Sequence, residues 1–336
     1  MMPGEDLSGL SFFPIQLQSL RVETVLPFPI FLRHASSGQY ILYRSKNTSF
    51  TQDILQQLID NRIEEIYVPR SERDEFFEYA SREIRHVVRD PDMDSRQKAE
   101  VVYSTTTRIM EDLFATPRAS RRLRQAKMAI HYSVEFILYD ENATRNLLKL
   151  TSHDYYTYTH SVNVTIYALA LARRVYSGEL DRHNFKLLAE GFLLHDLGKS
   201  VIPASIINHP GKLNETQWNL MRQHPEIGRK ILEETHQNNE VLDAIVYQHH
   251  ERIDGKGYPR QISRTEIHPY ARLCALADVF DAITTVRSYR EPLTTFEALK
   301  TMKDTMGDHF DWDYFNEFVK LFREDSDSAD PADPVS

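Results

Sequence analysis

Histidine and aspartate recur at short spacings between residues 195 and 259, and this pattern constrains the fold more than any other feature. An adjacent pair, His195-Asp196, is followed by His224 and then by a second adjacent pair, His249-His250. Imidazole and carboxylate are ligands that Zn, Fe, Mn and Ni accept in proteins. These donors exceed the needs of one tetrahedral ion, so we expect a site for two or more metals. Such a site suits the hydrolysis of a phosphodiester.

One His-Asp pair is not specific, but an ordered set of motifs is. The set consists of His160-Ser-Val-Asn-Val164, His195-Asp196 with Lys199, Pro203 through Gly211-Lys212-Leu213, His224-Pro225-Glu-Ile-Gly228, the block from His249 to Pro259, and Asp278-Val-Phe-Asp281-Ala followed by Arg287 and Arg290. This set resembles the HD-GYP family, a branch of the HD superfamily of metal-dependent phosphohydrolases. The resemblance covers the C-terminal half of the chain or slightly more.

The resemblance implies a helical bundle that carries two divalent ions. One ion would be held by His160, His195, Asp196 and Asp278. The other would be held by Asp196, His224, His249 and His250. A hydroxide bridging both ions would attack phosphorus, its pKa lowered by the two charges. Iron and manganese are the expected ions, with zinc and nickel as alternatives.

One position departs from the family pattern. Trinuclear members of the family place a glutamate one helical turn before the first histidine ligand. Here that position, four residues before His160, is Tyr156. A phenol replaces a carboxylate poorly as a ligand, so we predict two metals rather than three.

Cyclic di-GMP is the substrate that the resemblance implies, with Asp196 and Lys199 as the catalytic residues. Lys199 lies one turn beyond Asp196, where its ammonium could reach a phosphate oxygen; the alternative is a simple cation at a helix C-terminus. Arg287 and Arg290 could form a bidentate phosphate clamp, or they could be a surface pair.

The loop from Asp254 through Gly257, Tyr258 and Pro259 is expected to contribute to substrate binding. Its glycines and proline indicate a tight turn, and the ring of Tyr258 could stack on a guanine. A structural turn with Tyr258 buried is the second interpretation. A docking surface for GGDEF-domain proteins, which the family suggests, is the third. The sequence does not separate these three, and it leaves the role of Asp254 open.

Composition limits the class of protein. The chain has 336 residues, enough for two domains, and a formal net charge of −9, which argues against general binding of nucleic acid. No apolar run approaches the roughly 20 residues of a membrane span, and we expect no signal peptide and no membrane association. A single cysteine, Cys274, fits a reducing cytoplasm and is expected to be a small buried side chain.

The predicted fold is mainly α, with an all-helical HD-type bundle at the C-terminus and a small α/β domain at the N-terminus. We expect an accessory or regulatory domain over residues 1–90, a loose segment up to about residue 14 within it, and a helical connector over 91–150 that could mediate a homodimer. The phosphohydrolase domain is predicted over 151–324, and a disordered acidic tail over 325–336.

Residues 180–197 are predicted to form one helix that Gly198 ends in a left-handed conformation, so that His195 and Asp196 lie on a helix. Basic residues that cluster between Arg118 and Lys127 are expected to form a solvated helix face rather than a nucleic-acid arm, because no aromatic residues interleave.

Three functions follow from the sequence. The first is a phosphodiesterase that converts cyclic di-GMP to linear pGpG or to GMP, and two metals favour the linear product. The second is an effector that binds a cyclic dinucleotide with little turnover, although a pure binder does not need all seven metal ligands. The third is an HD-type phosphohydrolase acting on another nucleotide, which the complete Gly257-Tyr258-Pro259 block disfavours.

Overall fold

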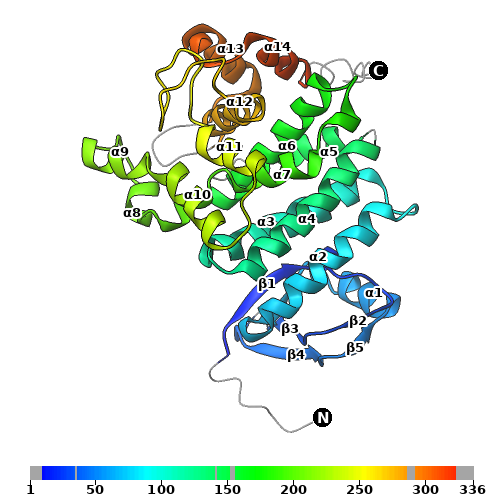
Figure 1. Cartoon of the computed structure of the whole chain (residues 1–336). Helices are drawn as coiled ribbons and strands as arrows, with labels where there is room; N and C mark the ends of the chain where they lie inside the picture. Colours follow the sequence, from blue (N-terminus) through cyan, green and yellow to red (C-terminus); the bar gives the residue numbers. More distant parts are fainter. Residues whose placement is uncertain (1–9, 35, 141, 152–155, 286–291, 323–336) are drawn as a thin grey trace, which may run out of the picture. The chain divides into compact units, whose positions relative to one another are not determined.

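The computed structural model describes residues 10–34, 36–140, 142–151, 156–285 and 292–322. These residues are mostly helical, and they divide into two compact units, Met1–Thr105 and Thr106–Ser336 (Figure 1). The division falls inside α3 (Ser95–Ala115), within the segment for which a separate connector was predicted. None of the described helices combines the length and the apolar composition that crossing a bilayer requires.

The N-terminal unit is built on a four-stranded antiparallel sheet with the strand order β1-β6-β3-β4. Its strands are β1 (Phe12–Gln16), β3 (Ile30–Arg33), β4 (Tyr40–Arg44) and β6 (Glu65–Pro69), and a two-stranded sheet pairs β2 (Thr24–Leu26) with β5 (Thr48–Phe50). The helices α1 (Gln52–Asp60) and α2 (Arg73–Arg89) complete the unit. Apolar side chains of α2, among them Phe76, Phe77 and Ile84, are buried in its core.

The expectation of a loose segment up to about residue 14 was wrong from Phe12 onwards. Strand β1 pairs with β6 in an antiparallel register from Phe12↔Pro69 to Gln16↔Glu65. The alternating burial of Phe13 and Ile15 is the pattern of a strand with one face against the core. A strand whose partner lies some fifty residues away in the sequence has no local signal to identify the pairing.

The C-terminal unit is an assembly of helices, with no strand among its described residues. After α3 the helices are α4 (Ser120–Tyr139), α5 (Ala143–Leu150), α6 (Thr157–Val175), α7 (Phe185–Leu194), α8 (Ala204–Ile207), α9 (Glu215–Met221), α10 (His224–Glu234), α11 (Glu240–Gln248), α12 (Pro269–Thr284), α13 (Thr295–Thr305) and α14 (Trp312–Lys320). Helix α6 packs against α7 and α12, and α11 packs against the same two helices. The region from residue 159 to 172 of α6 is buried on every side, so this helix lies in the centre of the unit.

The prediction for the helix around residues 180–197 was wrong at both ends. The α-helix runs only from Phe185 to Leu194, and Gly198 lies in a 3₁₀-helix, η4 (Leu197–Val201). Gly198 is not left-handed; it allows η4 to approach α10, because a Cβ atom there would overlap the carbonyl oxygen of His224 and the amide of Gly228. The glycine is therefore required for a tertiary contact between two backbones rather than for ending a helix.

The basic cluster also differs from the expectation. Lys127 forms an ion pair with the buried Glu190 at 2.8 Å, and Arg122 pairs with the buried Asp112. Both cations are mostly covered, so the solvated face was the wrong interpretation for these two residues. Arg118 is half exposed and pairs with Glu234 at the surface. Cys274 is fully buried, as expected.

The close contact between η4 and α10 predicts that a methyl group added at Gly198 lowers the free energy of unfolding. We expect Gly198→Ala to destabilise the protein by about 1–3 kcal/mol, because the Cβ atom forces the two backbones apart. Gly178→Ala is the matched control, since a Cβ atom there meets nothing within 4 Å, and it should change stability by less than about 0.5 kcal/mol. Thermal or urea unfolding measures both, and equal effects of the two substitutions would contradict the packing argument.

Candidate metal centre

Four histidines of the C-terminal unit share one arrangement of hydrogen bonds. Nδ1 of His195, His224 and His249 each donates to the backbone carbonyl oxygen of the residue three positions earlier, over 2.7, 2.8 and 2.9 Å. Nδ1 of His160 donates to Oδ2 of Asp281 over 2.7 Å. Because a carbonyl or carboxylate oxygen accepts, Nδ1 carries the proton in each ring and Nε2 is the atom available to a metal.

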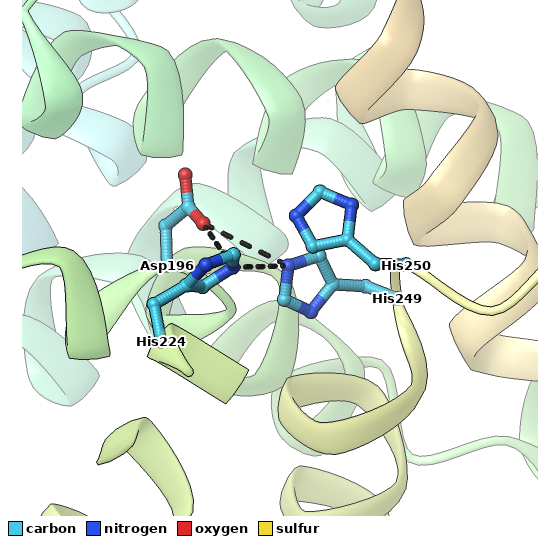
Figure 2. A group of neighbouring side chains, drawn as sticks. All are labelled: Asp196, His224, His249 and His250. Carbon is cyan, nitrogen blue, oxygen red and sulfur yellow. Dashed lines mark hydrogen bonds and ion pairs between the residues drawn. The ribbon is translucent and has the colours of Figure 1, made fainter. Parts of the chain in front are cut away.

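The structure brings all seven expected ligands into two groups, in each of which the ligand atoms lie within 4.8 Å of one another. One group contains Asp196, His224, His249 and His250, and the other contains His160, His195 and Asp278. Figure 2 shows the first group, with the rings of His224 and His249 facing the Asp196 carboxylate. Six of the seven residues are buried, and His250 is partly covered.

The Asp196 carboxylate faces both groups, and its side chain is fully buried. Its Oδ1 atom lies 3.2 Å from Nε2 of His224 and 3.7 Å from Nε2 of His249. Its Oδ2 atom lies 3.4 Å from Nε2 of His160 and 3.5 Å from Nε2 of His195. A carboxylate that offers one oxygen to each of two donor groups has the geometry of a ligand shared by two ions.

The donor atoms themselves fit a bound cation. The Nε2 atoms of His224 and His249 lie 3.2 Å apart. When both rings are neutral with the proton on Nδ1, two lone pairs face each other at this distance, and a shared cation converts that repulsion into two bonds. Nε2 of His250 is buried and has no hydrogen-bond partner among the described residues, which is costly unless a metal binds it.

Burial and charge hold most of these side chains in the protonation state of metal ligands. Burial alone would raise the pKa of the Asp196 carboxyl, but the Lys199 ammonium and His195 hold this pKa well below its usual range. Burial lowers the pKa of His249 to about 4 and that of His250 well below its usual value. An ionised carboxylate and neutral imidazoles are the forms that bind divalent cations.

His160 differs from the other histidines. Burial would lower its pKa, but hydrogen bonds to Asp278 and Asp281 outweigh this effect and raise the pKa to about 10. Its Nε2 atom lies 3.0 Å from Oδ1 of Asp278. His160 must therefore release the proton on Nε2 when a cation binds, while Nδ1 keeps its proton towards Asp281.

Both adjacent pairs of ligands lie where a helix ends, and the prediction that His195 and Asp196 lie within a helix was wrong. His195 is the C-cap of α7, and Asp196, with φ −98° and ψ 9°, precedes η4. His249 is likewise the C-cap of α11, and His250 follows it. Because the backbone leaves the helix at these positions, neighbouring side chains are not held at the angular separation that a continuous helix would impose.

A pocket of about 600 Å³ opens beside the two groups. His224, His250 and Asp278 form part of its wall, and Lys199 and Lys212 bring positive charge to it. The remaining lining residues are Ile206, Ile207, His209, Gly211, Leu213, Trp218, Met221, Tyr258, Val279 and Ala282. The volume is within the range of pockets that bind small molecules.

The residues predicted to bind substrate are placed differently from one another. The Lys199 ammonium lies 2.5 Å from Oδ2 of Asp196 and borders the pocket, as does Tyr258. Asp254 does not line the pocket; its carboxylate accepts from the backbone amide of Lys256 at 3.0 Å and pairs with Arg252 at 2.5 Å. Gly257 and Pro259 are not part of the lining either. Arg287 and Arg290, like the predicted tail, lie outside the described residues.

The loop that carries Tyr258 is held by its own backbone. A Cβ atom at Gly257 would overlap the backbone of Glu251 and Arg252, so only glycine permits this approach. The buried carboxylate of Glu251 accepts from the amides of Arg260, over 2.6 Å, and Ile262, over 3.2 Å. Glu251 was not among the predicted site residues, and its only local signal was its position directly after the histidine pair.

Asp281 and Asn163 support His160, and neither was among the predicted site residues. Asp281 is buried, and it accepts from Nδ1 of His160 and, over 2.9 Å, from Nδ2 of Asn163. Asn163 lies three residues after His160, and Asp281 three residues after Asp278, so each follows an expected ligand on the same face of its helix. That spacing was the available signal.

We expect Asp281→Asn to weaken metal binding about 10- to 100-fold, because the amide no longer fixes the tautomer and orientation of His160. Asp243→Asn is the matched control, since Asp243 lies on α11 and pairs with Arg229 at the surface. Isothermal titration of the metal-free proteins with Mn²⁺ measures both affinities. An unchanged affinity in Asp281→Asn would contradict the role assigned to this carboxylate.

Several known proteins are similar in sequence to this chain. A cyclic di-GMP phosphodiesterase of Pseudomonas aeruginosa is 36% identical over 238 residues, which are 71% of this chain and 54% of that protein. The cyclic di-GMP phosphodiesterase response regulator RpfG of Xanthomonas campestris pv. campestris is 40% identical over 134 residues, which are 39% of this chain and 35% of that protein. A 3'3'-cGAMP-specific phosphodiesterase of Vibrio cholerae is 36% identical over 136 residues, which are 38% of this chain and 26% of that protein. The chain therefore spans about half or less of the length of these relatives.

The fold has a counterpart among solved structures. The protein Bd1817 of Bdellovibrio bacteriovorus, described as an HDG"Y"P protein, superposes with a TM-score of 0.66 over 93% of this chain and 100% of that one, at 20% identity. The family model of the HD domain matches residues 142–313, a range that contains all seven expected ligands. Together with the Gly257-Tyr258-Pro259 block, these matches show that the chain belongs to the HD domain family, in its HD-GYP branch.

Proposed function

We propose that this chain hydrolyses a phosphodiester bond of cyclic di-GMP at a site for two divalent metal ions. The observation that carries the proposal is the Asp196 carboxylate, which offers Oδ1 to His224 and His249 and Oδ2 to His160 and His195. The substrate class is supported by the relatives, which include phosphodiesterases for cyclic di-GMP and for 3'3'-cGAMP.

Two divalent ions held by these residues would supply Lewis acidity for the attack of water on phosphorus. The chain's own part is to hold the donors in position and to bind the phosphate. His195, His224 and His249 are oriented by backbone carbonyl oxygens, and His160 is oriented by Asp281. Such preorganised donors need no rearrangement when a cation arrives.

Lys199 is the residue that we assign to the phosphate. Its side chain is almost fully buried, and its ammonium lies against Oδ2 of Asp196, at the edge of the pocket. An ammonium in this position can donate to a phosphate oxygen bound beside the two donor groups. Iron or manganese are the proposed ions, with zinc and nickel as alternatives, because donor sets of imidazole and carboxylate accept all four.

The predicted docking of GGDEF-domain proteins on the Gly257-Tyr258-Pro259 loop remains a proposal, as does a homodimer through residues 91–150. The side chain of Tyr258 faces His250, with ring centroids 4.6 Å apart, so it is turned towards the site. A protein partner would have to contact Lys256, Pro259 and Arg260, which are exposed.

Turnover separates the proposed enzyme from an effector that only binds. Protein reconstituted separately with Fe²⁺, Mn²⁺, Zn²⁺ or Ni²⁺ should convert cyclic di-GMP to linear pGpG in at least one metal, as followed by chromatography. His195→Ala should abolish this turnover. Retained nucleotide binding without hydrolysis in any metal would establish the effector function instead, and parallel reactions with 3',3'-cGAMP would show which cyclic dinucleotide is preferred.

We expect Lys199→Ala to raise KM for cyclic di-GMP about tenfold or more with a smaller change in kcat, because one charge-assisted hydrogen bond to phosphate is lost. Lys300→Ala is the control, since Lys300 is an exposed residue of α13 that pairs with Asp304. Steady-state kinetics measure both. Unchanged kinetics in Lys199→Ala would refute its assignment to the phosphate.

The number of ions per chain tests the inference from Tyr156. Tyr156 is exposed and stacks on Tyr158 with ring centroids 5.3 Å apart. We expect elemental analysis of the active protein to give about two ions per chain, because no carboxylate replaces the glutamate of trinuclear members at this position. A stoichiometry near three would refute this expectation.

A further inference from the structure

The lining of the pocket includes two aromatic rings that are not among the expected metal ligands, those of Trp218 and Tyr258. Trp218, on α9, lines the same cavity as His224, His250 and Asp278, and 44% of its surface is exposed. Exposed apolar side chains are ordinary when they are scattered over a surface. An indole that borders a cavity beside a phosphate site is different, because a ligand in that cavity can cover it.

Trp218 is joined to the metal donors by a row of stacked groups. The guanidinium carbon of Arg222 lies 5.7 Å from the ring centroid of Trp218 and 5.8 Å from that of Tyr258. The ring of Tyr258 in turn stacks on His250, with centroids 4.6 Å apart and an angle of 25° between the planes. The cation–π contacts of Arg222 with both rings link α9 to the Tyr258 loop and favour one position of the indole.

The segment that presents Trp218 is well defined in itself. Asn214 and Gln217 form a capping box at the start of α9, over 2.9 Å in each direction. The carbonyl oxygen of Met221, at the end of α9, accepts from Nδ1 of His224. The indole and a metal donor are therefore held by one short stretch of chain.

We propose that Trp218 is the stacking platform for one purine base of the cyclic dinucleotide, and that Arg222 is a positioning residue for it. The assignment rests on the proposed function for the class of substrate. The charges in the pocket agree with it, because Lys199 and Lys212 suit the phosphates of a nucleotide while the indole suits the flat face of a base. This makes α9 a determinant of substrate affinity separate from the metal centre.

The chain contains two tryptophans with nearly equal exposure, Trp218 at 44% and Trp312 at 43%, so each can serve as the control for the other. Trp312→Phe leaves Trp218 as the sole indole emitter, and Trp218→Phe leaves Trp312. Each metal-loaded variant is mixed with cyclic di-GMP in a stopped-flow instrument, and emission is read before turnover. We expect saturable quenching of Trp218 by the stacked base and no change in Trp312.

Kinetics supply the second measurement. Trp218→Ala should raise KM for cyclic di-GMP about tenfold or more with little change in kcat, because a base stacked on an aromatic ring contributes to binding in the ground state and the transition state alike. Trp218→Phe should retain most of the affinity, and Trp312→Ala should leave KM unchanged. Arg222→Gln should raise KM and reduce the quenching amplitude, and Arg222→Lys should restore part of both.

The outcomes distinguish this inference from the proposed function. Hydrolysis without quenching of Trp218, and with an unchanged KM in Trp218→Ala, overturns the inference alone. Quenching of Trp218 without hydrolysis supports the inference and overturns the proposed activity. The absence of both quenching and hydrolysis overturns both.

Discussion

A fully buried carboxylate flanked by histidines on both sides is the constraint on which the C-terminal unit depends. An ionised group in the interior is costly unless opposite charge or hydrogen bonds compensate it. Asp196 meets that condition through the Lys199 ammonium and through His160, whose Nε2 carries a proton, while cations bound by the remaining Nε2 atoms would complete the compensation. Five helices around Asp196 each place a donor next to it. The donors of α6 and α12 lie within the helix, and those of α7, α10 and α11 lie at a helix end.

The precision of this arrangement comes from backbone contacts as much as from side chains. Three of the histidines donate to carbonyl oxygens in the last turns of α7, α9 and α11, so the end of a helix fixes both the tautomer and the direction of each ring. Gly198 lets η4 lie directly against α10, and Gly257 lets the Tyr258 loop fold onto the chain that follows His250. A side chain at either glycine would displace the backbone next to a donor, although neither glycine lines the pocket.

Most of the helical fold was predictable from local patterns, whereas the full set of expected donors came from the resemblance to the HD-GYP family. An all-helical bundle was expected over residues 151–324, and no strand occurs among the described residues of that segment. Strand β1 and the contact made by Gly198 were not predicted, since each involves residues distant in the sequence. The sequence also left two roles open for Asp254, in a turn or in binding. The structure shows its carboxylate in contact with Lys256 and Arg252 of its own loop.

The sequence by itself determined the expected donors, because imidazole and carboxylate side chains in this order resemble the pattern of the HD-GYP family. Only the tertiary structure decided how they divide, with Asp196 between two groups of donors. It also decided that Asp281 orients His160 and that Trp218 borders the pocket. The physical reason is that the side chains available to an ion or a base depend on where helices end and on how closely their backbones approach, and both are properties of the packed molecule.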